Sequence, residues 1–149
     1  MSKILVLANN DVGLYKFRKE LLQELLNQGN QVYISLPNGE FIEPLTKMGC
    51  KFFDTPIDRR GMNPIKDIGL FLKYLKLTKQ LKPDLVITYT IKPNIYGGIS
   101  CAFKNIPYAI NITGLGTTFQ KDNFVFKMIT KLYRIACRKA KVVFFENEE

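Results

Sequence analysis

The chain has 149 residues, 46% of them hydrophobic and 23% charged, so it can form one globular domain with a full core. It holds no apolar run of the ~18–20 residues that a membrane-spanning helix needs. Its net charge of +9 points to an anionic partner, but neither a zinc-finger spacing nor an RNP-like aromatic motif supports nucleic acid. The absence of histidine excludes the catalytic triads that depend on it, and Cys50, Cys101 and Cys137 lack a metal-ligand spacing, so we expect neither a metal nor a cofactor.

Short apolar runs alternate with helical patterns along the whole chain. This alternation predicts βαβ units and an α/β fold: a Rossmann-like, doubly wound, mostly parallel sheet in one domain over residues 1–149. The predicted strands cover about 3–8, 31–36, 51–54, 84–88, 108–112 and 141–145. The predicted helices cover about 14–28, 39–48, 64–81, 93–103 and 123–139. The first apolar run is too short for a signal peptide, so we expect a cytoplasmic protein.

Polar or flexible residues gather where two of the predicted strands end. Those near the end of strand 84–88 are Tyr89, Lys92 and Asn94, and those near the end of strand 108–112 are Asn111, Thr113, Gly114 and Gly116. Ligands of open α/β sheets bind outside the carboxyl ends of the strands. We therefore expect a binding site built by the turns after the first, fourth and fifth strands.

The turn after the first strand, ANNDVGLY, contains only Gly13. It lacks the GxGxxG fingerprint that lets a backbone approach a pyrophosphate, which argues against a dinucleotide. Asn9, Asn10 and Asp11 stand there instead. Asp11 is a candidate general base, since a carboxylate is one of the few bases left in a chain without histidine. The alternative is that Asp11 forms the turn and caps the following helix.

Four cations near the predicted site are candidates for binding an anion. Arg18 follows one turn into the first helix, and Arg59 and Arg60 form a pair whose guanidinium groups suit bidentate contacts to phosphate. Lys92 opens a helix whose free N–H groups and dipole favour an anion. The alternatives are solvated arginines and, at Lys92, simple initiation of the helix with Thr90 as its cap.

The last predicted helix carries the clearest charge pattern. At about 100° per residue, its basic side chains form one stripe roughly 80° wide. We call this set the basic stripe: Lys127, Lys131, Arg134, Arg138 and Lys141. A basic amphipathic helix can lie on an anionic membrane surface. The alternative is an ordinary covering helix with a solvated basic edge.

Several strings of this sequence resemble the amino-terminal half of glycosyltransferase family 4 enzymes. TYTIKPNIYGG and NITGLGTTF carry the resemblance, and FRKEL, DRRGMNP and VVFFENEE fit it in order. The nearest sub-group is that of capsular and O-antigen polysaccharide assembly, with the CapM-like and PglA-like enzymes. The resemblance spans essentially the whole chain.

The resemblance implies one half of a GT-B fold, the half that binds the acceptor. It implies transfer of a sugar from a nucleotide-sugar, held by a second domain that we expect to be absent here, to a polyprenyl-pyrophosphate-linked saccharide. The protein would then work on the inner face of the plasma membrane, and Asp11 would act on a sugar hydroxyl. The histidine that the family often carries near Gly114 is missing. The alternatives are a non-catalytic, membrane-recruiting half of a split enzyme and a flavodoxin-like module for a small ligand.

Overall fold

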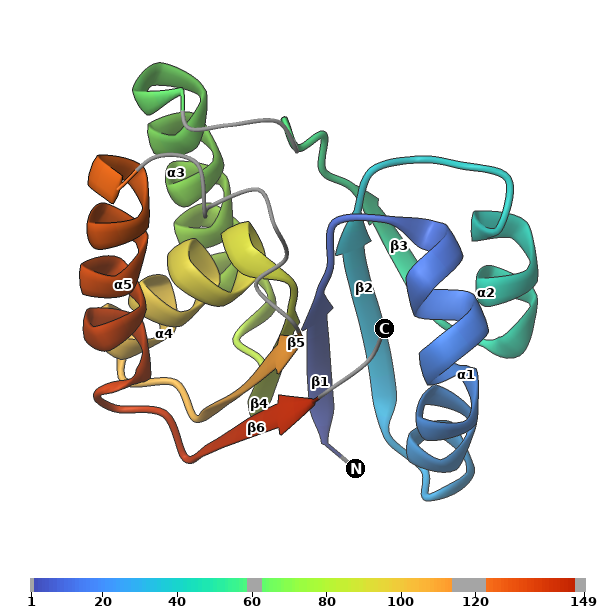
Figure 1. Ribbon diagram of the computed structural model, residues 1–149. Helices are drawn as coiled ribbons and strands as arrows, with labels where there is room; N and C mark the ends of the chain where they lie inside the picture. The colour runs from blue at the N-terminus through green and yellow to red at the C-terminus, as the bar shows by residue number, and fades with distance from the viewer. Residues whose placement is uncertain (1, 59–62, 114–122, 147–149) are drawn as a thin grey trace.

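The computed structural model describes residues 2–58, 63–113 and 123–146, and in them the predicted α/β architecture is confirmed (Figure 1). Its sheet is parallel throughout, with the strand order β3-β2-β1-β4-β5-β6. The strands are β1 Lys3–Leu7, β2 Gln31–Leu36, β3 Lys51–Asp54, β4 Leu85–Tyr89, β5 Tyr108–Thr113 and β6 Val142–Glu146. The helices are α1 Asp11–Asn27, α2 Ile42–Met48, α3 Pro64–Leu81, the π-helical turn η1 Pro93–Gly97, α4 Gly98–Lys104 and α5 Asn123–Cys137.

Helices cover both faces of the sheet, so the fold is doubly wound. Helices α1 and α2 lie on one face, and α3, α4 and α5 lie on the other (Figure 1). Alternate residues of β1 enter the two cores: Ile4 and Val6 pack with α1 and α2, whereas Leu5 and Leu7 pack with α3 and α4. This explains why the strands read as continuous apolar runs rather than as alternating patterns.

The predicted boundaries are close to the observed ones, and the differences have local causes. Helix α1 begins at Asp11 rather than 14, because the Asn10 side chain caps it by accepting a hydrogen bond from the Gly13 amide at 2.6 Å. Helix α2 begins at Ile42 rather than 39. Helix α5 ends at Cys137, so Arg138 lies in the turn beyond it. These shifts leave the order of the elements as predicted.

One helix differs in kind from the prediction. The segment 93–103 was predicted as a single α-helix, but it starts as the π-helical turn η1 and continues as α4. Within this turn Gly97 lies against the sheet so closely that a Cβ atom there would overlap the Leu7 side chain. The wide turn therefore brings its backbone directly onto β1. Such π turns are frequent at functional sites.

Candidate functional site

The strand order changes direction between β1 and β4. From β1 the chain winds outward to β2 and β3, and it then returns across α3 to β4, on the other side of β1. Leu7 of β1 pairs in register with Thr88 of β4, and Tyr89 pairs with Asn111 of β5. The carboxyl ends of these three strands therefore meet at one edge, as predicted, and this edge contains the switch point at which open α/β sheets bind ligands.

The turn after β1 presents two amide side chains. The Nδ2 group of Asn10 donates to Oδ1 of Asn9 at 2.7 Å, and both residues are partly exposed at the edge. Asn10 also caps α1, so the suggestion that Asp11 is the cap was wrong. An amide that is locked in this way offers a fixed pattern of donors and acceptors to a polar ligand.

Asp11 is held against the turn that precedes α2. Its Oδ2 atom accepts a hydrogen bond from the backbone amide of Phe41 at 2.8 Å, and the residue is buried. A Cβ atom on Gly39 would overlap this carboxylate, so a larger residue there would require the Asp11 side chain to move. One oxygen of the candidate base is therefore engaged with protein backbone.

Arg18 and Tyr89 connect α1 with the end of β4. The guanidinium carbon of Arg18 lies 4.7 Å from the centroid of the Tyr89 ring, within the range of a cation–π contact. Arg18 is half-buried, so part of its side chain is still in contact with solvent. The contact keeps one positive charge beside the switch point.

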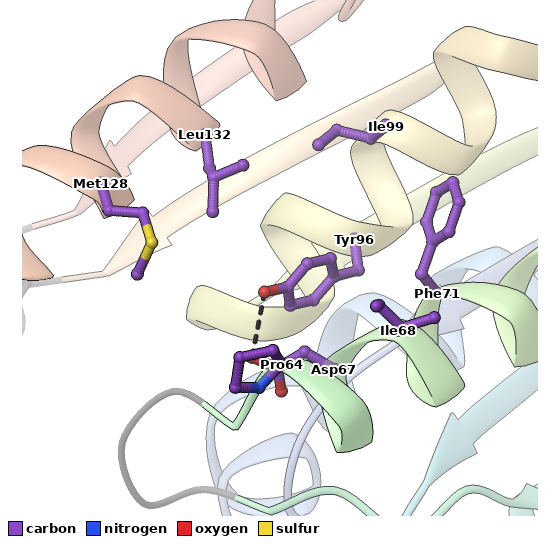
Figure 2. A pocket seen from close by; sticks show the side chains of 8 residues that line it. All are labelled: Pro64, Asp67, Ile68, Phe71, Tyr96, Ile99, Met128 and Leu132. Atoms are coloured by element: carbon purple, nitrogen blue, oxygen red, sulfur yellow. Dashed lines mark hydrogen bonds between the residues drawn. The ribbon is translucent and has the colours of Figure 1, made fainter.

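An apolar pocket of about 360 Å³ opens on the face covered by α3, η1, α4 and α5 (Figure 2). Figure 2 shows side chains from all four elements turned toward it. We call it the apolar pocket, and its lining residues are Pro64, Asp67, Ile68, Phe71, Tyr96, Ile99, Met128 and Leu132. Its two polar lining residues, Asp67 and Tyr96, also belong to a network of polar contacts with Lys92.

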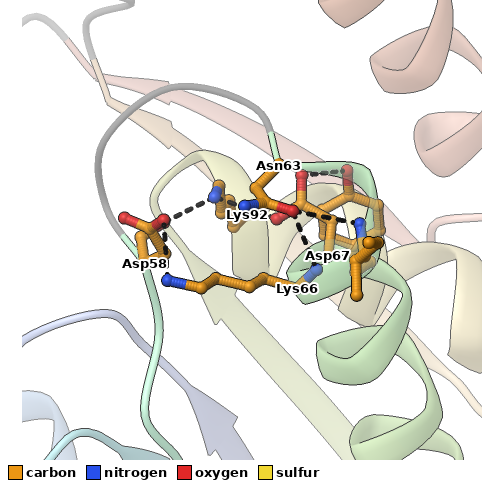
Figure 3. A network of polar contacts seen from close by, with 7 residues as sticks. Asp58, Asn63, Lys66, Asp67 and Lys92 are labelled. Atoms are coloured by element: carbon orange, nitrogen blue, oxygen red, sulfur yellow. Dashed lines mark hydrogen bonds and ion pairs between the residues drawn. The ribbon is translucent and has the colours of Figure 1, made fainter.

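A buried ion pair joins η1 to α3 (Figure 3). The Lys92 ammonium lies 2.9 Å from Oδ1 of Asp67, and these residues are only 8% and 4% exposed. Lys92 also donates to the backbone carbonyl of Asp58. The charge expected to meet an anion is thus neutralised by Asp67. No side chain caps η1, and the Thr90 hydroxyl, which was a candidate for the cap, donates instead to the carbonyl of Tyr89.

The second oxygen of Asp67 faces the apolar pocket. It accepts a hydrogen bond from the Tyr96 hydroxyl at 3.0 Å. Burial of Tyr96, together with the negative charge of Asp67 and this hydrogen bond, raises the pKa of Tyr96 well above its usual range. Tyr96 therefore stays protonated and continues to donate.

Asn94 lies beneath the edge rather than on it. It is fully buried, its Oδ1 accepts from the Thr88 hydroxyl at 2.6 Å, and its Nδ2 donates to the Asn111 carbonyl at 2.8 Å. The same Nδ2 donates to the Tyr133 hydroxyl at 3.2 Å. Asn111 is also buried and donates to the carbonyl of Thr88 at 3.3 Å. The two residues predicted to contact a ligand instead connect β4, β5 and α5 and support the edge.

The other predicted site residues have different outcomes. Thr113 is the last residue of β5. Arg59, Arg60, Gly114 and Gly116 lie outside the described residues. All five side chains of the basic stripe are exposed, although Arg138 and Lys141 follow α5 rather than belong to it. Among the described residues, no ion pair involves the stripe.

Three residues of this arrangement were missed in the sequence: Asp67, Tyr96 and Tyr133. Asp67 stands in the first turn of a helix, where an acidic residue is ordinarily explained by the helix dipole. Tyr96 and Tyr133 look like amphipathic core residues. Nothing local distinguishes them, because their partners are distant in the sequence. Across the described ranges, no cluster of metal-ligating side chains occurs and no helix is both long and apolar enough to span a membrane.

The chain matches the Glycosyl transferase 4-like family over residues 3–147. It is 26% identical, over 147 residues, to the N,N'-diacetylbacillosaminyl-diphospho-undecaprenol alpha-1,3-N-acetylgalactosaminyltransferase of Campylobacter jejuni, and the match covers 95% of this chain and 39% of that protein. The chain thus spans about two fifths of the length of this curated relative.

Two solved structures show the same fold. MurG from Acinetobacter baumannii superimposes with a TM-score of 0.68 at 18% identity, covering 100% of this chain and 42% of that one. UDP-GlcNAc 2-epimerase from Neisseria meningitidis, bound to UDP-GlcNAc, superimposes with a TM-score of 0.61 at 13% identity, covering 90% of this chain and 38% of that one. The match over nearly the whole sequence shows that this chain belongs to the Glycosyl transferase 4-like family.

Proposed function

We propose that this chain is the acceptor-binding domain of a glycosyltransferase that moves a sugar from a nucleotide-sugar to a polyprenyl-diphosphate-linked saccharide. One observation carries the proposal: the relative aligned with 95% of this chain is named for transfer to a diphospho-undecaprenol-linked sugar. The product would serve the synthesis of capsule, O-antigen or exopolysaccharide. The fold supports this assignment, since its parallel sheet brings polar groups of β1, β4 and β5 to one edge.

The nucleotide-sugar would be bound by a second domain that is not part of these 149 residues. The chain corresponds to 39% of its Campylobacter relative and to 42% of MurG, which leaves room for such a domain in those proteins. The acceptor saccharide would lie between the two domains, against Asn9, Asn10 and the Arg18–Tyr89 pair. Arg59, Arg60, Gly114 and Gly116 remain candidates for contacts to its diphosphate or sugar.

The reaction needs a group that accepts one proton. The acceptor hydroxyl attacks the anomeric carbon of the donor, the bond to the nucleoside diphosphate breaks, and the hydroxyl proton passes to a base. We assign that role to Asp11, because it is a carboxylate at the switch point of a chain without histidine. Its Oδ2 holds the Phe41 amide, so the other oxygen would take the proton.

The acceptor would be met at the inner face of the plasma membrane, where the protein docks peripherally. The basic stripe supports this proposal, because its side chains are exposed and carry five of the chain's positive charges. Each Lys or Arg near an anionic surface adds about 1 kcal/mol of attraction. The polyprenyl carrier would hold the saccharide at the same surface.

A transfer assay tests the proposed function. The protein that carries this chain together with its donor domain is incubated with radiolabelled UDP- and GDP-sugars and an undecaprenyl-diphosphate-linked monosaccharide, and the organic phase is counted. We expect label in the lipid product and at least a hundredfold loss with Asp11→Asn, which keeps a hydrogen-bond acceptor for the Phe41 amide but removes the base. Absence of transfer from every donor contradicts the function, and full activity of Asp11→Asn contradicts the role of Asp11.

A further inference from the structure

We propose that the apolar pocket binds the first prenyl units of the acceptor's polyprenyl chain, next to its diphosphate. This inference deepens the proposed function and rests on it. It assigns a ligand to a cavity that the edge residues do not use: the saccharide is held at the switch point, and the hydrocarbon is held between α3, η1, α4 and α5.

The lining of the pocket selects a hydrocarbon. Six of its eight residues are apolar, and the polar groups of the other two, Asp67 and Tyr96, are already paired. The remaining oxygen of Asp67 is bound to Lys92. A sugar or a nucleotide in this pocket would lose its hydrogen bonds to water without gaining new ones, whereas an aliphatic chain loses none. The volume of about 360 Å³ falls within the range of ligand pockets.

Exposed apolar side chains of α3 lie next to the pocket, since Ile68 both lines the pocket and is exposed. Ile65 is 83% exposed, Ile68 is 59% exposed and Leu72 is 56% exposed, and they follow one another along the helix face. Their spacing of three and four residues places them on one face of α3, and exposed apolar side chains that gather on one face suit contact with an apolar partner. A long prenyl chain could leave the pocket over this surface and continue into a bilayer.

Two exposed lysines of α5 are next in sequence to lining residues of the pocket. Lys127 precedes Met128 and Lys131 precedes Leu132, so each lysine stands about 100° around α5 from a lining residue. Both lysines are exposed. Apolar lining beside cationic side chains is complementary to a ligand that is hydrocarbon at one end and a diphosphate at the other.

The pocket also lies close to the proposed saccharide site. Tyr96 of its wall belongs to η1, which follows β4 at the sheet edge, and Asp67 is bound to Lys92 at the start of the same turn. The ion pair thus separates the apolar pocket from the polar edge. A prenyl chain in the pocket and a sugar at the edge would let one acceptor molecule occupy both places.

Titration calorimetry with soluble probes tests the inference on the 149-residue chain. The probes are farnesyl diphosphate, inorganic pyrophosphate and dodecyl phosphate, each below its micelle concentration. We expect farnesyl diphosphate to bind at least tenfold more tightly than either of the others. Equal binding of pyrophosphate would reduce the site to an anion site, and equal binding of dodecyl phosphate would show an unselective lipid surface. Either result overturns the proposal.

Three variants locate the binding. Leu132→Trp fills the pocket and Met128→Gln makes its wall polar, and each should weaken farnesyl diphosphate at least tenfold. Phe103→Gln is the matched control, because Phe103 is an exposed apolar residue of α4 that does not line the pocket, and its affinity should not change. Circular dichroism and urea midpoints confirm that each variant is folded. Unchanged affinity in a folded Met128→Gln protein overturns the assignment.

The outcome is separable from that of the proposed function. Specific farnesyl diphosphate binding without sugar transfer would support the pocket and contradict the transferase. Sugar transfer without farnesyl diphosphate binding would support the transferase and contradict the role of the pocket.

Discussion

Breaking the ion pair between Lys92 and Asp67 should cost far more stability than breaking an ordinary surface pair. Lys92→Met removes the ammonium but keeps the length of the side chain. It leaves the Asp67 carboxylate buried, with the Tyr96 hydroxyl as its remaining side-chain partner among the described residues. Asp67→Asn does the opposite and leaves a buried ammonium that faces an amide.

The magnitude follows from burial. Removing one partner of a buried ion pair typically destabilises a protein by about 3–5 kcal/mol, because the other charge stays desolvated and uncompensated. Both residues here are more than nine-tenths buried, so we expect each single substitution to lower the free energy of unfolding by about 3 kcal/mol. The double variant, which buries no unpaired charge, should cost clearly less than the sum of the two.

Urea unfolding followed by circular dichroism at 222 nm measures the four free energies of this double-mutant cycle. The matched control is Lys47→Met, because Lys47 and Glu43 form an exposed ion pair at 3.5 Å within α2. Such a pair contributes only about 0.3–0.5 kcal/mol. The m-values should agree among the variants, so that differences in midpoint report stability.

Two results would refute this reasoning. If the single substitutions cost less than about 1 kcal/mol, the pair is solvated or relaxes easily in solution. If their effects simply add in the double variant, Lys92 and Asp67 do not interact energetically, and the connection between η1 and α3 must be explained by packing alone.

Three further predictions concern other parts of the molecule. Gly97→Ala should destabilise the fold by roughly 1–3 kcal/mol, because its Cβ would overlap the core side chain of Leu7. Gly69 lies in open space within α3, so Gly69→Ala should stabilise the fold by about 0.5–1 kcal/mol. Urea unfolding measures both changes. Burial raises the pKa of Tyr133 to about 12, so the folded state holds this proton more tightly, and stability should fall as the pH rises from about 10 through 12. The free energy of unfolding of the Tyr133→Phe variant should fall less over that range. If its slope against pH equals that of the unmodified protein, the assignment to Tyr133 is contradicted. The last prediction replaces four residues of the basic stripe, Lys127, Lys131, Arg134 and Arg138, by glutamine. The variant should stay folded but no longer float with phosphatidylglycerol vesicles at low salt. If it still floats, or if the unmodified protein floats equally with neutral vesicles, α5 is only a covering helix.

Local sequence signals determined most of the framework. Helix α3 begins and ends as predicted, because Asn63 accepts from the Ile65 and Lys66 amides, Pro64 suits the first helical position, and the apolar period continues to Leu81. The alternation of strands and helices likewise predicted the parallel sheet, since parallel strands need crossover connections. These signals act over a few residues, so they can be read directly from the sequence.

The tertiary structure alone decided what the polar residues of the edge do. The sequence predicted that Lys92 and Asn94 face a ligand, since both follow a strand end. The fold instead buried them against Asp67 and Tyr133, and Tyr133 is separated from Asn94 by 39 residues. No local pattern encodes such a partner, because the strand order brings the two elements together only after folding. The position of a residue at the strand end therefore followed from the sequence. The direction of its side chain, and whether its charge is neutralised by a partner, depended on distant segments that pack over it.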